Sequence, residues 1–419
     1  MPARPYATDV VRKLKEAGFI AYFAGGWVRD YLMKRPSDDI DIATSASVEE
    51  IQALFPKTIP VGVAFGIIIV VHDKFQFEVA TFRQDRGYVD GRRPSGIDPA
   101  TPEEDAKRRD FTINGMFYDP IEEKLLDFVE GQKDIEKKLI KAIGNPHDRF
   151  AEDRLRMMRA VRYSTRFDFT IEQATFDAIL AHAKDLVPAV AIERIWQEFK
   201  KMSQFAHFDE GLITLHELKL LPTIFPSLET LSLEELKKRV STIEQFPKNT
   251  PPIAELLELF PESSLENLLE LSEYLKLSRG EKEFVRFLHH TRSLFAMPNA
   301  WLEKLELIEW AQFYAHPSSE ICLEIFAAHY PPEEKTHFLS SHATRRQTLE
   351  KAIKRIQENN PVIKAEDLMK RGIAPGKKMG DLLRAAERIA VNQNLEDKDA
   401  ILKQLTLALN RLGSQFHTS

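Results

Sequence analysis

Strand-forming sequence is confined to the first third or so of this chain. Runs of β-branched, aromatic or otherwise apolar residues at 19–24, 67–71 and 75–82 are bounded by turn residues and predict β-strands. From Glu152 onward helical patterns dominate, punctuated by prolines. The pattern predicts an α+β fold in which a head that contains the strands is followed by all-helical regions.

Composition excludes several classes of protein. The chain has 419 residues, a net charge of −6 and one cysteine, Cys322, so it has no internal disulfide or cysteine zinc site and is predicted to be cytoplasmic. We expect no signal peptide and no membrane partner, because no apolar run is long enough to cross a bilayer. Basic residues cluster at 154–166, 344–346 and 370–378, so nucleic acid remains a possible partner despite the acidic balance.

A paired glycine and an Asp-x-Asp sequence stand close together near the N-terminus. Gly25 and Gly26 follow an apolar run and precede Arg29, so the backbone there can press against phosphates. Asp39 and Asp41 alternate with isoleucines, which predicts a strand over 38–43 with both carboxylates on one face. Such a pair binds hard cations, and the combination suggests Mg²⁺-dependent nucleotidyl transfer.

Glu78 is the candidate third carboxylate. It alternates with apolar neighbours in the strand predicted over 75–82, which the turn at 72–74 should join to the strand before it. Three carboxylates can hold two Mg²⁺ ions about 3.5–4 Å apart. The alternative is that these are ordinary exposed acids of a strand. Residues 83–105, which are rich in Gly, Pro, Asp and Arg and lack a period, are predicted to form a long mobile loop.

Two later sequences carry paired charges. Arg108 and Arg109 precede Asp110 and Asn114, a set that suits the phosphates and ribose of a nucleotide; the alternative is a helix start with Asp110 at its N-terminus. A second sequence, predicted to be one helix, runs from Glu152 to Arg166. It places Arg159, Arg162 and Arg166 on one side with Arg156 at the border, and it makes Asp153 and Arg156 neighbours at i and i+3. An adjacent carboxylate and guanidinium can read the Watson–Crick edge of a base, although a salt-bridged helix face has the same spacing.

Taken in order, these motifs resemble the class II tRNA nucleotidyltransferase and bacterial poly(A) polymerase family over about the first 200 residues. The resemblance implies a polymerase-beta-like head with a mixed sheet (1–145), a base-reading helical neck (146–205), a helical body (206–355) and a tRNA-binding tail (356–419). It implies that Asp39 and Asp41 hold two Mg²⁺ ions and Glu78 assists. It also implies that Asp153 and Arg156 pair with the incoming base while Glu152 orients the arginine, and that residues 83–105 act as a lever in the switch from CTP to ATP.

The function expected from the resemblance is addition of C, C and A to the 3′ end of tRNA from CTP and ATP, with release of pyrophosphate and without an obligate protein partner. The nucleotide-binding residues would be Gly25, Gly26, Arg29, Arg109, Asp110, Asn114, Glu152, Asp153, Arg156, Arg159 and Arg162. Lys370, Arg371, Lys377 and Lys378 flank a predicted turn between two tail helices and would bind RNA phosphates; the alternative is a solvated connection. An ATP-only enzyme, either a poly(A) polymerase or an A-adding transferase, and an RNA-binding protein with an inactive head are the competing hypotheses.

Overall fold

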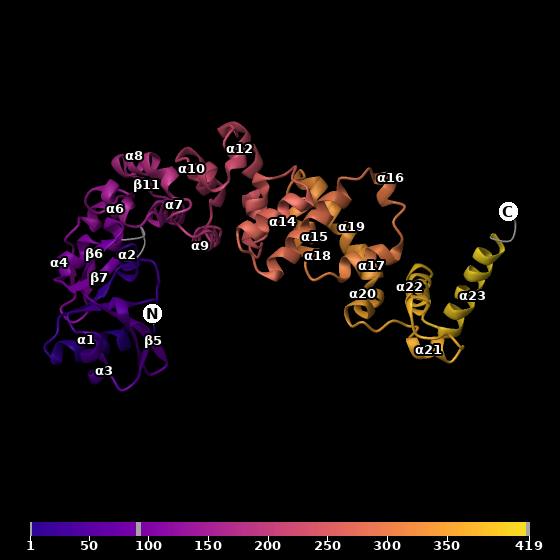
Figure 1. Cartoon of the computed structure of the whole chain (residues 1–419), viewed down its shortest axis with the longest axis horizontal. Helices are drawn as coiled ribbons and strands as arrows, with labels where there is room; N and C mark the ends of the chain where they lie inside the picture. The colour runs from indigo at the N-terminus through magenta and orange to yellow at the C-terminus, as the bar shows by residue number, and fades with distance from the viewer. Residues whose placement is uncertain (1, 89–93, 416–419) are drawn as a thin grey trace. The chain divides into compact units, whose positions relative to one another are not determined.

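The computed structural model describes residues 2–88 and 94–415 (Figure 1). The chain divides into two compact units, Met1–Glu244 and Gln245–Ser419. The first unit contains the mixed sheet and the second is helical, which confirms the predicted α+β class. Across the described ranges, no helix is long and apolar enough to cross a membrane.

The sheet of the first unit has the strand order β3-β4-β5-β2-β1-β8-β9. Strands β2 and β5 are parallel, whereas the other neighbours run antiparallel, so the sheet is mixed. Its strands are β1 (Ala21–Ala24), β2 (Asp41–Thr44), β3 (Thr58–Gly62), β4 (Ile67–His72), β5 (Phe75–Thr81), β8 (Phe117–Asp119) and β9 (Lys124–Leu126).

Successive side chains along each strand point to opposite faces of the sheet, and the two faces have different surroundings. Ile42, Ile68 and Val79 are buried in a core shared with helices α1 (Arg4–Glu16), α2 (Gly26–Leu32) and α3 (Val48–Leu54). On the opposite face a smaller core of Ala24, Ala43, Phe82, Ala106 and Phe117 closes the sheet over β1, β2 and β8, with Ala106 supplied by α4 (Pro102–Lys107). This second face carries the acidic residues.

Two local predictions in the sheet can be compared with the structure. The turn between β4 and β5 is confirmed, since His72 pairs with Phe75 and Asp73 takes a left-handed φ of 55°. Strand β2 begins at Asp41 rather than residue 38, so Asp39 precedes it. The predicted alternation still holds there, because Asp39 and Asp41 are exposed and Ile40 and Ile42 are buried.

The described parts of residues 83–105 form two paired strands and most of a helix, so the prediction of a long loop without strands or helices was wrong. Strands β6 (Arg83–Tyr88) and β7 (Pro94–Pro99) pair antiparallel, and a capping box at Thr101 starts α4. The strands are polar and are joined by backbone pairing and an exposed Arg86–Asp98 ion pair, so they lack the apolar alternation by which strands are recognised. The tip at 89–93 lies outside the described residues.

The rest of the first unit is mainly helical. It extends to Glu244, and its helix α10 (Phe208–Glu217) packs against α7 (Leu155–Phe167). Its later elements are α5 (Gly131–Glu136), β10 (Leu139–Ile140), α6 (Pro146–Glu152), α7 (Leu155–Phe167), β11 (Thr170–Ile171), α8 (Gln173–His182), α9 (Ile192–Met202), α10 (Phe208–Glu217), α11 (Leu220–Ile224) and α12 (Leu233–Val240).

The second unit has separate buried clusters for its earlier helices and for its last three. The helices are α13 (Pro252–Leu256), α14 (Leu265–Tyr274), α15 (Arg279–Phe295), α16 (Asn299–Leu302), α17 (Leu307–Ala315), α18 (Ser319–Ala327), α19 (Pro332–Thr348), α20 (Glu350–Gln357), α21 (Ala365–Met369), α22 (Lys377–Asn392) and α23 (Lys398–Gln415).

Gly131 lies where α5 packs closely against the 3₁₀ turn η2 (Thr112–Asn114). A Cβ at position 131 would lie 2.3 Å from the carbonyl oxygen of Thr112. Gly131→Ala should therefore lower the free energy of unfolding by roughly 1–3 kcal/mol, because backbone must move to admit the methyl group. Denaturant unfolding measures this, with Lys133→Ala on the exposed side of α5 as the control, expected within about 0.5 kcal/mol of wild type. Equal stabilities for the two variants would contradict the close contact.

Candidate active site

Three carboxylates meet on the acidic face of the sheet. Asp41 opens β2 and Glu78 lies on β5, one residue before the paired residues Ile42 and Val79 of these parallel strands. Burial raises the pKa of Asp41 to about 7, with further contributions from Glu78 and Asp39, although its side chain still reaches solvent. Burial and Asp39 raise the pKa of Glu78 as well. The structure thus brings together the three acids that the sequence pattern selected.

The donor set suits a hard cation that shares its ligands with substrate. No group of three or more His, Cys, Asp or Glu within 2–88 and 94–415 is arranged to enclose a metal ion. Mg²⁺ in proteins usually takes one or two carboxylates, keeps several waters and completes its shell with substrate phosphates. Asp39 and Asp41 could supply those carboxylates, and a cation would offset both the burial and the repulsion from Glu78 and Asp39 that raise the pKa of Asp41.

The glycine pair forms the tight connection between β1 and α2. Gly25 has a φ of 62°, and its N–H donates to the carbonyl of Met116 at 3.2 Å. A Cβ at Gly25 would come within 3.1 Å of Nη1 of Arg109, so glycine at this turn lets the guanidinium of Arg109 lie against the backbone. Arg109 also lies over the ring of Phe117, 5.0 Å from its centroid.

Asp105 is a buried acid that the sequence analysis did not select. Its carboxylate accepts hydrogen bonds from Arg108 at 2.6 Å, from Arg109 at 2.9 Å and from the backbone N–H of Arg83 at 3.2 Å. Burial alone would raise the pKa of Asp105, but Arg109 and Arg108 outweigh it and the pKa is lowered. The spacing Asp105–Arg108–Arg109 at the end of α4 was the available sequence signal, as i, i+3 and i+4 neighbours.

Asp110, Asn114 and Arg29 form a buried chain of hydrogen bonds. Asn114 donates to Asp110 at 3.1 Å and accepts from Arg29 at 2.6 Å. Arg29 is only 3% exposed, pairs with Asp30 at 2.7 Å and lies 4.5 Å from the ring centroid of Phe167. The guanidinium of Arg29 is therefore bound by its protein neighbours, and its expected role in nucleotide binding stays a prediction.

Each arginine of α7 meets an acid from another part of the first unit. Arg156 donates to Glu152 at 2.7 Å, the contact that the resemblance implied. Arg159 pairs with Asp110 at 2.6 Å, and Arg162 with the buried Glu198 at 2.5 Å. Burial raises the pKa of Asp110 on its own, but Arg159 and Asn114 reverse this and hold the pKa well below its usual range. The guanidinium groups of Arg159 and Arg162 thus bind carboxylates of the protein itself.

The chain between Glu152 and Leu155 is not helical, so the prediction of one continuous helix was wrong. Helix α6 ends at Glu152, and Asp153 has extended backbone angles of −141° and 103°. One carboxylate oxygen of Asp153 accepts from the N–H of Leu155 at 3.0 Å, and the other lies 3.4 Å from Arg194. The aspartate competes with the helix for this N–H, as Asp does at helix starts.

The four tail cations flank a turn, as predicted. Lys370 and Arg371 follow α21, Lys377 and Lys378 open α22, and all four are exposed. Gly372 within the turn has a left-handed φ of 81°, and Arg371 lies 3.3 Å from Asp399.

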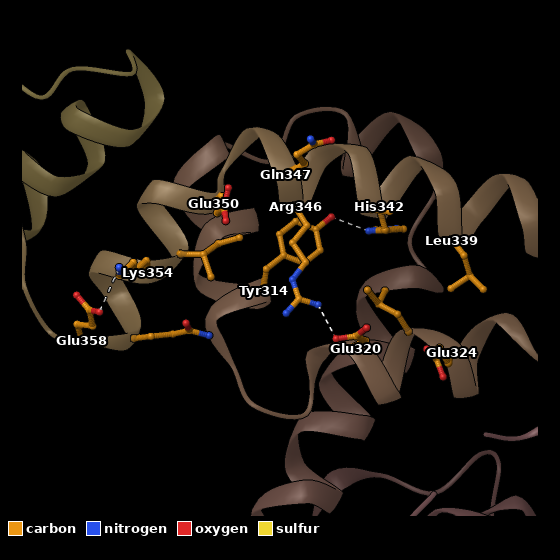
Figure 2. Close-up of a pocket in the computed structure, with 14 residues that line it drawn as sticks. Tyr314, Glu320, Glu324, Leu339, His342, Arg346, Gln347, Glu350, Lys354 and Glu358 are labelled. Carbon is orange, nitrogen blue, oxygen red and sulfur yellow. Dashed lines mark hydrogen bonds and ion pairs between the residues drawn. The ribbon is translucent and has the colours of Figure 1, made fainter. Parts of the chain in front are cut away.

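A cavity of about 940 Å³ lies in the second unit (Figure 2). Arg346 pairs with Glu320 at 2.8 Å there, and the hydroxyl of Tyr314 lies 2.7 Å from Nδ1 of His342. The lining carries more acidic than basic side chains, so this cavity is not suited to a nucleotide triphosphate.

Known proteins similar to this chain match it over nearly its whole length, and those reported below are CCA-adding enzymes. Residues 21–141 match the family described as the poly A polymerase head domain, and 168–231 match a probable RNA and SrmB-binding site of polymerase A. The chain is 33% identical to the CCA-adding enzyme of Enterococcus faecalis, with 94% of each chain covered. It is 33% identical to that of Pediococcus pentosaceus, with 97% of each covered.

Among solved structures, the Bacillus stearothermophilus CCA-adding enzyme in complex with CTP superposes with a TM-score of 0.81 at 28% identity, covering 99% of both chains.

His342 should make the protein less stable in mild acid. Burial, reinforced by Arg345, lowers the pKa of His342 to about 4, whereas an unfolded histidine titrates near 6.5. The unfolded chain therefore binds the extra proton first, and stability should fall as the pH drops from about 6.5 toward 4, by roughly 2 kcal/mol between pH 7 and 5. Denaturant unfolding of His342→Gln at both pH values should lack this part of the slope. His337→Gln, an exposed position on the same helix, is the control; if His342→Gln keeps the same pH slope as this control, the effect is absent.

Proposed function

This chain belongs to the CCA-adding enzymes, and we propose that Asp39, Asp41 and Glu78 form the centre at which it carries out their reaction. The enzyme adds C, C and A to the 3′ end of tRNA from CTP and ATP. In each addition the 3′-hydroxyl of the RNA attacks the α-phosphorus of the nucleotide, a new P–O bond forms, and the bond to pyrophosphate breaks. The observation that supports the assignment is the meeting of three carboxylates beside the Gly25–Gly26 turn.

Nucleotidyltransferases generally use divalent metal ions. We propose that in this chain Asp39 and Asp41 hold two Mg²⁺ ions. When bound, such ions activate the attacking hydroxyl and stabilise the charge on the leaving pyrophosphate. Burial is the main cause of the raised pKa of Asp41, and the neighbouring Glu78 and Asp39 add to it; this concentration of carboxylates favours cations at the centre. Glu78, one strand away, adds to that negative charge and assists in orienting the attacking group.

The nucleotide would lie between the glycine turn and α7. Arg109 is held by Asp105 beside Gly25, in position to bind phosphate oxygens together with the backbone at Gly26. Asp110 and Asn114 are proposed to contact the ribose. Their arrangement is fixed by Arg29 and Arg159, which are positioning residues in this proposal, as is Arg162 through Glu198.

Asp153 and Arg156 are proposed to read the base of the incoming nucleotide. Arg156 is kept in one orientation by Glu152 and by two backbone carbonyls, those of Arg149 and Arg108. An arginine with fixed donors and an aspartate with acceptors can match the edges of cytosine and adenine. These side chains take the place of a template strand.

We further propose that Lys370, Arg371, Lys377 and Lys378 bind phosphates of the tRNA, since four exposed cations flank one turn. The enzyme would act in the cytoplasm, as its composition predicts. No observation favours the ATP-only alternative, and the CTP complex of a similar structure counts against it.

A product ladder tests the function and the centre together. A tRNA that ends at its discriminator base should gain two residues with CTP alone and three with CTP plus ATP. Asp39→Asn or Asp41→Asn should lower every addition by at least about 100-fold, because the loss of a metal ligand removes activation of both the nucleophile and the leaving group. Binding of tRNA should persist, since it depends mainly on phosphate contacts elsewhere. Asp73→Asn at the β4–β5 turn is the control; near-normal ladders from the two active-site variants would refute the centre.

Substitution of Asp153 or Arg156 should impair the choice of nucleotide more than it slows the chemical step. Asp153→Ala or Arg156→Ala should weaken the preference for CTP and ATP over UTP and GTP by roughly 1–3 kcal/mol, by analogy with paired base contacts. Glu152→Gln should have a smaller effect in the same direction, because it only loosens Arg156. Competition among all four nucleotides measures the ratio, with Arg154→Ala as the neighbouring control. Unchanged ratios in all variants would favour a purely structural salt bridge.

A further inference from the structure

The acidic face of the sheet continues into a partly exposed apolar surface. Ile59 on β3 and Ile67, Ile69 and Val71 on β4 alternate with residues such as Ile68 and Val70, which are buried in the core on the other face. Ile59 is 38% exposed, and the other three are partly exposed. We call these four residues the aliphatic shelf.

The aliphatic shelf is in register with the carboxylates. Ile59 pairs with Ile69, and Ile69 pairs with Glu78, so all three side chains project from the same face in one row across the sheet. Asp41 is the next member of that row on β2. Neighbouring strands are about 4.8 Å apart, which places Ile69 about 10 Å and Ile59 about 14 Å from Asp41 along the row.

The other end of the row is already occupied. Asp41 pairs with Ala24, and Ala24 with Phe117, both of which belong to the small core closed by α4. Arg109 and the Gly25 turn, which bind the triphosphate in the proposed function, also lie at that end. In phosphoryl transfer the attacking and leaving oxygens are roughly in line on opposite sides of phosphorus. The RNA that supplies the attacking hydroxyl must therefore approach from the side of the aliphatic shelf.

We propose that the base of the 3′-terminal RNA nucleotide packs on Ile69 and Ile59, which makes them positioning residues for the attacking hydroxyl. The inference rests on the proposed function. The base at the RNA terminus changes with each addition, so its contact must be indifferent to base identity. Apolar side chains meet this need because every base has an apolar face, whereas hydrogen-bonding groups would discriminate.

The test compares RNA acceptors with and without a terminal base. One tRNA ends at its discriminator nucleotide, and the other carries at that position an abasic ribose with both hydroxyls. With wild type, removal of the base should lower kcat/KM for the first CTP addition about tenfold, since the apolar contact is lost. In Ile59→Thr/Ile69→Thr the intact tRNA should already react about tenfold more slowly, and removal of the base should cost less than about twofold.

The controls separate this inference from its alternatives. Ile121→Thr, an isoleucine with 42% exposure at the other edge of the sheet, should behave as wild type. Each enzyme is compared with itself, so a partly unfolded preparation cancels from the ratio, and Ile59→Thr alone serves if the double variant does not fold. A tenfold loss on base removal that persists in the variants, or wild type that is indifferent to the base, would overturn the proposal. A normal CCA ladder from the wild-type enzyme in the same experiment supports the proposed function independently of the result for the aliphatic shelf.

Discussion

The site of this enzyme depends on the pairing of buried and half-buried arginines with carboxylates along one helix. Arg156, Arg159 and Arg162 of α7 are each within 2.7 Å of an acid, and those acids come from α6, from the segment before η2 and from α9. A guanidinium removed from water is costly unless it is paired and hydrogen-bonded, so each pair fixes two elements relative to each other. The groups that we propose to read the base and to contact the ribose lie on these elements, so their positions depend on the pairing.

The parts of the site that lie on strands could be predicted from the sequence. Period two placed Asp39 and Asp41 on one side, and Glu78 followed from the same rule on β5, because strand alternation is set by backbone geometry alone. The pairing of β2 with β5, which brings Glu78 to Asp41, is a contact between distant segments and could only be supplied by the resemblance or by the structure.

The features that the sequence patterns missed share a physical cause, which is competition between local and distant partners. Asp153 was predicted inside a helix, but its backbone is extended and its carboxylate accepts from the N–H of Leu155, two residues along the chain. Arg29 donates to Asn114, 85 residues away in sequence, a contact that no local spacing indicates. The hairpin of β6 and β7 escaped notice because polar strands held by backbone pairing have no apolar period. None of these outcomes is encoded in the spacing of residues along one element.

Asp105 joins two parts of the enzyme that are usually considered separately. One carboxylate accepts from the backbone where the β6–β7 hairpin begins and from the arginine beside the glycine turn. The start of the hairpin and the guanidinium that we propose to bind phosphate thus share one acidic partner. Replacement of Asp105 by a neutral residue would remove both contacts in a single step, so the two features cannot be altered independently at this position.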